Sequence, residues 1–273
     1  MSRNTQRSLC WPRSTPDWIR LTCERSFHLV SQACEPIVCG IVVGSSCEQI
    51  LANTFTEFAD IDLVFVIERT FEFGAILFDV AQFEQEMRNS LKWLPYDINI
   101  SYNGVPFSSC CERKETLELD FIPQSIAFIH EKDCQSVLDM AKRFRILVTG
   151  TDVYQPLAET PISYDLVQDR MKATKAYIKR GLDRNMGSEM FWMQYIAKSA
   201  LLLTSYLIIE EEPSVKKDVI AKNVSEKYEI LSTSMDYYLK IYQGQLKTNT
   251  ATLMRQFELY CNKLDTIFRL EYE

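Results

Sequence analysis

Residues 37–67 read IVCGIVVGSSCEQILANTFTEFADIDLVFVI, and the second apolar segment of this region opens with two aspartates two positions apart. In a β-strand, side chains two residues apart lie on the same face, so Asp60 and Asp62 are expected to project side by side. Two carboxylates this close repel each other and are normally tolerated with a cation between them. The pair therefore predicts a metal site at the start of a strand.

The first apolar segment of this region ends in a glycine-serine turn, Gly44-Ser45-Ser46, which a short helix-like segment follows. Backbone N–H groups at the start of a helix suit a phosphate. The hydroxyl of Ser45 is expected to contribute, whereas Ser46 is either a further phosphate contact or the N-cap of a helix over 47–55. A phosphate site beside a metal site indicates a protein that binds a metal-bound nucleoside triphosphate.

The second apolar segment is hydrophobic on both faces, because Val64 and Val66 share the face of the two aspartates. A strand of this kind lies in the middle of a sheet. A simpler interpretation is a pair of surface aspartates after a turn. That interpretation leaves unexplained why a central strand should carry two carboxylates.

The order of these parts resembles the signature of the DNA polymerase β-like nucleotidyltransferase superfamily: a Gly-Ser turn, a helix, then a strand carrying Asp-hydrophobic-Asp. The matching residues are Gly44, Ser45, Asp60 and Asp62, and the 14 residues between Ser45 and Asp60 are a longer spacing than usual. The resemblance implies transfer of a nucleoside monophosphate, AMP in the first place, from ATP or another nucleoside triphosphate to a hydroxyl. It also implies two Mg²⁺ ions, with Asp60 and Asp62 as ligands.

Members of this superfamily usually carry a third carboxylate on a later strand, where it completes the second metal site and helps to deprotonate the acceptor. Asp97 is the first choice, because it lies in a short alternating strand over 96–101 that follows a helix and a turn. Asp120 in the strand over 116–122 is the second choice, and Asp79 is the third. The alternative for Asp97 is a solvent-facing position on an edge strand.

The pattern of the chain changes after residue 155. The first part predicts an α+β domain over 1–155, a mixed sheet with helices of the nucleotidyltransferase type. Its expected strands cover 37–43, 60–67, 96–101, 116–122 and 145–148, and its expected helices cover 17–35, 80–91 and 133–145. The second part, 156–273, predicts an all-α bundle. Its expected helices cover 163–181, 189–210, 214–243 with a break, and 248–270.

The helical part offers lysines to a triphosphate. Lys172, Lys175 and Lys179 share one helix face, and Lys198 lies in an otherwise apolar helix. Because burial of an unpaired ammonium is costly, Lys198 is the candidate that would reach the triphosphate. The alternatives are a solvated face for the first three lysines and, for Lys198, an edge position from which the ammonium reaches water.

Composition limits the compartment and the partners. A net charge of −7 argues against a basic nucleic-acid platform, although it leaves room for a local basic patch. Nine cysteines and two histidines show no metal-ligand spacing, and the odd cysteine count with a polar N-terminus favours reduced thiols in the cytoplasm. The longest apolar stretch, 191–209, contains polar residues and predicts a buried helix rather than a membrane span.

The acceptor that the resemblance implies first is a small molecule, an aminoglycoside, which would connect the protein to antibiotic resistance. Two alternatives stay open. The same chemistry could modify a protein hydroxyl or a transfer RNA end, as in toxin–antitoxin relatives. The chain could also be a non-catalytic module that binds nucleotides. The sequence favours an enzyme, because the Asp-x-Asp pair is intact.

Overall fold

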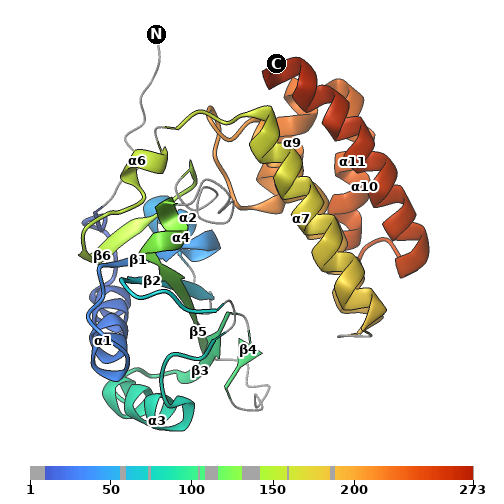
Figure 1. Ribbon diagram of the computed structural model, residues 1–273. Coiled ribbons are helices and arrows are strands. Elements are labelled where there is room, and N and C mark those ends of the chain that lie inside the picture. Colours follow the sequence, from blue (N-terminus) through green and yellow to red (C-terminus); the bar gives the residue numbers. More distant parts are fainter. Residues whose placement is uncertain are drawn as a thin grey trace. The chain divides into compact units, whose positions relative to one another are not determined.

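The computed structural model describes residues 10–55, 60–72, 75–103, 105–107, 116–130, 142–158, 160–184 and 188–272. The chain divides into two compact units, Met1–Ala158 and Glu159–Glu273. The first unit contains a sheet with helices, and the described part of the second is helical (Figure 1). The predicted α+β sheet domain followed by an all-helical part is confirmed. No helix in the described ranges combines the length and the apolar character needed to cross a membrane.

A six-stranded mixed sheet forms the first unit, with the strand order β4-β3-β5-β2-β1-β6. The central pairs, β2 with β5 and β5 with β3, are parallel, and the outer pairs are antiparallel. The strands are β1 (Cys39–Val43), β2 (Ile61–Ile67), β3 (Asp97–Tyr102), β4 (Val105–Pro106), β5 (Thr116–Ser125) and β6 (Ile146–Gly150). The helices are α1 (Asp17–Ala33), α2 (Gly44–Leu51), α3 (Val80–Leu91), α4 (Ile126–His130) and α6 (Gln155–Ala158).

One face of the sheet is mainly apolar and carries the main core. Helices α1 and α3 lie together on this face (Figure 1), and their buried residues recur at helical spacing. Alternate residues of the central strands, among them Leu63, Phe65, Leu119 and Phe121, point into this core and are fully buried. Because these residues of β2 and β5 point into the core, the residues between them, such as Asp62 and Asp120, must point to the opposite face of the sheet.

The opposite face of the sheet changes character across its width. Over β1 and β2 it is apolar, with Ile41, Val64 and Val66 buried against Ile129 of α4 and Tyr154. Over β3 and β5 the same face is polar and partly exposed. Its residues there are Asp97, Asn99, Ser101, Thr116, Glu118 and Asp120. The boundary between the apolar and polar halves lies at the start of β2, where Asp62 is located.

Local signals explain the ends of several helices. Asp79 caps α3 by accepting a hydrogen bond from the backbone N–H of Gln82 at 2.9 Å. Asp17, a residue type that often caps helices, does not cap the first helix, because α1 begins at Asp17 itself and the N-cap position is Pro16. Asp17 instead pairs with Arg20 one turn later. The helix expected over 133–145 lies mostly outside the described residues.

The second unit consists of α7 (Tyr164–Asp183), α8 (Glu189–Thr204), α9 (Lys217–Lys227), α10 (Ser232–Tyr242) and α11 (Thr250–Tyr272), with two short 3₁₀ segments. Serine side chains cap the first two helices: Ser163 accepts from Leu166 N and Ser188 from Phe191 N. The end of the expected helix over 189–210 is a 3₁₀ turn, Ser205–Leu207, rather than a continuation of α8. Helices α8, α10 and α11 form the centre of the bundle, since each packs closely on another of the three.

A buried ion pair joins β6 to the segment after it. Arg145 is 1% exposed and Asp152 8%, and the guanidinium lies 2.8 Å from the carboxylate. Gln155 also accepts a hydrogen bond from Arg145, and Asp152 accepts one from the backbone of Tyr154. The pair thereby holds Tyr154 and the start of α6 beside the sheet.

We expect Arg145→Met to destabilise the protein strongly, because Asp152 would stay buried without its cation. The expected loss is about 3–5 kcal/mol in the free energy of unfolding, measured by urea denaturation. Lys240→Met is the matched control: its pair with Asp236 is equally short, at 2.7 Å, but both side chains are about half exposed, so the loss should stay below about 1 kcal/mol. Equal losses in the two variants would contradict the importance of the buried pair.

Candidate active site

The turn after β1 is built around Gly44. Its φ of +76° lies in the left-handed region, where L side chains are strained. Helix α2 begins at Gly44, with Val43 as the N-cap and no side chain capping the helix. The first N–H groups of α2 are thus free of a side-chain cap at the end of a strand, which is the arrangement that suits a phosphate.

Gly44 is also required by its neighbour, Asp62. Val43 and Asp62 are register partners in the antiparallel β1–β2 pair. An added Cβ at Gly44 would overlap Oδ2 of Asp62, so the carboxylate lies directly against the glycine. The turn and the second aspartate of the Asp-x-Asp pair therefore form one compact site.

Asp120 lies beside Asp62 on the next strand. The parallel β2–β5 pair puts Asp62 opposite Asp120, and both side chains are half-buried on the polar side of the sheet. Neighbouring strands are about 4.8 Å apart. The two carboxylates, which are remote in the sequence, thus belong to adjacent positions on one face.

Ser101 extends this row to a third strand. It is the register partner of Asp120 in the β3–β5 pair, and its hydroxyl donates a 2.8 Å hydrogen bond to Oδ1 of Asp120. Ser101 is a candidate functional residue that the sequence did not single out. The alternation of the strand puts Ser101 on the same face as Asn99 and Asp97. Its hydrogen-bond partner, Asp120, could not be predicted, because it depends on the order of the strands in the sheet.

Asp97, the first choice for the third carboxylate, does not lie on a strand next to that of Asp62. Strand β5 lies between β3 and β2, so β3 does not touch β2. Asp97 is exposed at the first position of β3, opposite Thr116. Along β3, Asp97 is four positions before Ser101, the residue that lies opposite Asp120. Four strand positions correspond to about 13 Å. Asp79, the third choice, caps α3 instead.

The remaining predicted residues of the first unit differ in their access to solvent. Asp60 is exposed and lies immediately before β2, two residues ahead of Asp62. Ser45 is half-buried in the first turn of α2. Ser46 is fully buried, and its hydroxyl donates back to the carbonyl of Val43. The N-cap expectation for Ser46 is wrong, because Val43 holds that position, and a phosphate contact by Ser46 stays a prediction.

The lysines of the second unit lie on the surface of its helices. Lys198 is exposed on α8, so its ammonium is solvated rather than buried as the apolar sequence around it suggested. Lys172 is exposed on α7 and is held by Gln168 and Asp169. Lys175 is half-buried and Lys179 exposed on the same helix. Binding of a triphosphate by Lys198 stays a prediction.

The donor set of the site is compatible with a magnesium ion that arrives with phosphates. Among the residues that the structure describes, no three His, Cys, Asp or Glu side chains form a ready-made metal cluster. Mg²⁺, however, usually binds through one or two carboxylates together with substrate phosphates and water. Asp62 and Asp120 provide two such carboxylates at adjacent positions.

Comparison with known proteins gives a structural likeness with a low TM-score. No model of a known protein family matches the chain, and no curated protein matches it in sequence. A crystal structure of the spectinomycin adenyltransferase AAD(9) from Enterococcus faecialis, with ATP and spectinomycin, aligns with a TM-score of 0.47 and 11% sequence identity. The alignment covers 92% of this chain and 99% of that one. The function must therefore be inferred from the residues of this chain.

We expect Gly44→Ala to be more destabilising than Gly244→Ala, although both glycines have a φ above +70°. At Gly244 an added Cβ meets no atom within 4 Å, so only backbone strain of about 1–2 kcal/mol opposes the alanine. At Gly44 the alanine must also displace the Asp62 carboxylate, which should add about 1–3 kcal/mol.

Urea denaturation of the two variants measures the difference in the free energy of unfolding. Asp62→Ala combined with Gly44→Ala should recover the added part of the loss, since the overlapping carboxylate is gone. Equal losses for Gly44→Ala and Gly244→Ala would show that Asp62 does not approach the turn as described.

Proposed function

We propose that this protein is an enzyme, a Mg²⁺-dependent nucleotidyltransferase that moves a nucleoside monophosphate from a nucleoside triphosphate to a hydroxyl group. The observation that carries the proposal is the juxtaposition of Asp62 with both the Gly44 turn and Asp120. A phosphate-binding helix start and a carboxylate pair are the two parts that this chemistry requires. The motif order over 37–67, which resembles the polymerase β-like superfamily, supports the same reaction.

The residues of the turn are proposed to hold the phosphates. The N–H groups at the start of α2 and the hydroxyl of Ser45 would bind the outgoing β- and γ-phosphates. Asp62 and Asp120, with Asp60 just ahead of β2, would be the ligands of Mg²⁺. When bound, Mg²⁺ neutralises charge on the phosphates and stabilises the in-line displacement.

The bond changes follow from this placement. The oxygen of the acceptor hydroxyl forms a bond to the α-phosphorus, and the bond from that phosphorus to the bridging oxygen of pyrophosphate breaks. The proton of the acceptor hydroxyl passes to a carboxylate oxygen of Asp120, which takes the role of general base first considered for Asp97. Ser101 would keep Asp120 in place by holding Oδ1.

The proposed donor is ATP, and the proposed acceptor is a small molecule with several hydroxyls, of the aminoglycoside class. The superfamily resemblance supports this choice, and a net charge of −7 favours the approach of a cationic acceptor. The proposed catalytic residues all lie in the first unit. Lys198 of the second unit is the candidate for contact with the triphosphate.

Incubation of the full chain with each labelled nucleoside triphosphate, Mg²⁺ and a set of acceptors tests the reaction. The set comprises aminoglycosides, spectinomycin, transfer RNA and the protein itself, and labelled product with release of pyrophosphate is the expected result. Label on transfer RNA or protein would move the acceptor to the macromolecular class. Magnesium-dependent binding of ATP without turnover on any acceptor would favour a non-catalytic module.

We expect Asp62→Asn and Asp120→Asn each to lose transfer by on the order of a thousandfold, because each removes a ligand that acts in the transition state. Asp97→Asn is the matched control: it removes an exposed carboxylate from the same face of the sheet and should retain nearly full activity. Initial rates of labelled product, with circular dichroism to check the fold, measure the effect. Loss of activity in Asp97→Asn with none in Asp120→Asn would return the role to Asp97.

Ser101→Ala should lower the rate of transfer about ten- to hundredfold, because a hydrogen bond to a charged group contributes about 1.5–3 kcal/mol. Ser101→Thr keeps the hydroxyl and should retain most of the activity. The pH profile of transfer gives a separate measure, since Ser101 contacts the proposed general base directly. An unchanged profile with a reduced rate would indicate a purely structural role for Ser101.

A further inference from the structure

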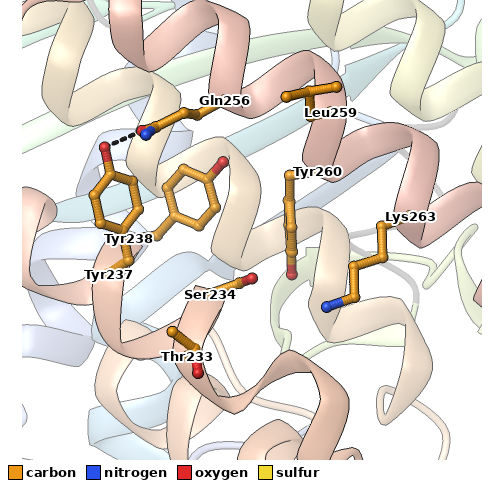
Figure 2. Close-up of a pocket in the computed structure, with 8 residues that line it drawn as sticks. All are labelled: Thr233, Ser234, Tyr237, Tyr238, Gln256, Leu259, Tyr260 and Lys263. Carbon is orange, nitrogen blue, oxygen red and sulfur yellow. Dashed lines mark hydrogen bonds between the residues drawn. The ribbon is translucent and has the colours of Figure 1, made fainter.

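The second unit contains a pocket between helices α10 and α11, with a volume of about 350 Å³ (Figure 2). Its lining residues are Thr233, Ser234, Tyr237, Tyr238, Gln256, Leu259, Tyr260 and Lys263. This volume is in the range of pockets that bind small organic molecules. None of the residues proposed for nucleotidyl transfer belongs to this pocket.

Aromatic rings form the inner wall. Tyr238 and Tyr260 are buried, with ring centroids 5.0 Å apart, and Tyr237 continues the wall towards the surface. Leu259, which is 63% exposed, completes the apolar part at the rim. A planar ring is the ligand group that such walls favour, because aromatic pairs pack edge-to-face or offset at these separations.

Tyr238 and Tyr260 carry no charge near neutral pH. Burial raises the pKa of the Tyr238 phenol, and burial also raises that of Tyr260. The hydroxyl of Tyr260 is shared in a hydrogen bond with Thr204. The inner wall therefore places no negative charge against a ligand.

The polar groups of the pocket are mainly donors. The Tyr237 hydroxyl donates to Oε1 of Gln256 (dashed in Figure 2), which leaves the amide nitrogen of Gln256 as a donor. The Lys263 ammonium donates to the carbonyl of Ile230 and pairs with no carboxylate among the residues that the structure describes. No acidic side chain lines the pocket. A cation without a carboxylate, beside an amide donor and two hydroxyls, is complementary to an anion.

We propose that this pocket binds a small aromatic carboxylate, whose ring packs on Tyr238 and Tyr260 and whose carboxylate accepts hydrogen bonds from Lys263. Ring and anion are both needed, because the wall offers no charge to hold a bare anion and the lysine offers no surface to hold a neutral ring. The pocket shares no residue with the proposed site of nucleotidyl transfer, and binding here does not depend on that reaction.

Titration of the full chain with benzoate, followed by NMR chemical-shift changes or calorimetry, tests the proposal. Benzamide is the neutral probe of the same shape, and acetate is the anion without a ring. Benzoate should bind at least about tenfold more tightly than either, which is the effect expected of one charge-assisted hydrogen bond. Equal affinity for benzamide, or no saturable binding of benzoate at millimolar concentration, would overturn the proposal.

Variants locate the binding on the protein. Lys263→Met keeps the aliphatic stem and should weaken benzoate about tenfold while leaving benzamide unchanged. Lys247→Met, at an exposed lysine outside the pocket, is the control and should leave benzoate binding unchanged. Lys263→Arg keeps the positive charge and should retain binding. Weakening by Lys247→Met as much as by Lys263→Met would show nonspecific binding and contradict the site.

Discussion

The approach of the Asp62 carboxylate to the α-carbon of Gly44 is the constraint on which the candidate site depends. It requires a residue without a side chain at the end of β1, and it requires β1 and β2 to pair in the register that puts Val43 opposite Asp62. The same glycine supplies the left-handed backbone from which α2 starts. The start of α2, the register of the β1–β2 pair and the position of the Asp62 carboxylate are therefore all tied to Gly44.

The elements close to the motif could be predicted from the sequence with good accuracy, because their signals are local. Alternation and composition predicted β1, β2 and β5 nearly at their observed bounds, and α3 over Val80–Leu91 as it stands. The helix ends were less accurate where a tertiary arrangement replaces a local cap. Asp17 had the right chemistry for an N-cap, but Pro16 holds that position with an extended backbone, and Asp17 is the first residue of α1.

The site was harder to predict, because its third strand depends on the order of strands in the sheet. Asp97 follows Asp62 sooner in the chain, and proximity in the chain favoured it. The sheet, however, places β5 next to β2, so that Asp120 is the residue opposite Asp62. No periodicity within β3 or β5 carries this information, since it lies in the pairing of segments. Ser46 was misplaced for a local reason: α2 begins three residues earlier than expected, so Val43 holds the N-cap position and the buried Ser46 hydroxyl bonds to its carbonyl.

The position of β5 has a consequence for the synthesis of the protein. Strand β5 is made after both of its neighbours, β2 and β3, yet it separates them in the sheet. While residues 116–125 are still within the ribosome, β2 and β3 both have an unpaired edge, and an apolar edge of this kind can pair with other chains. Parallel pairing between remote segments is also slow to form. The growing chain is therefore most exposed to aggregation just before β5 emerges, and the carboxylate pair comes into existence only when this strand has entered the sheet.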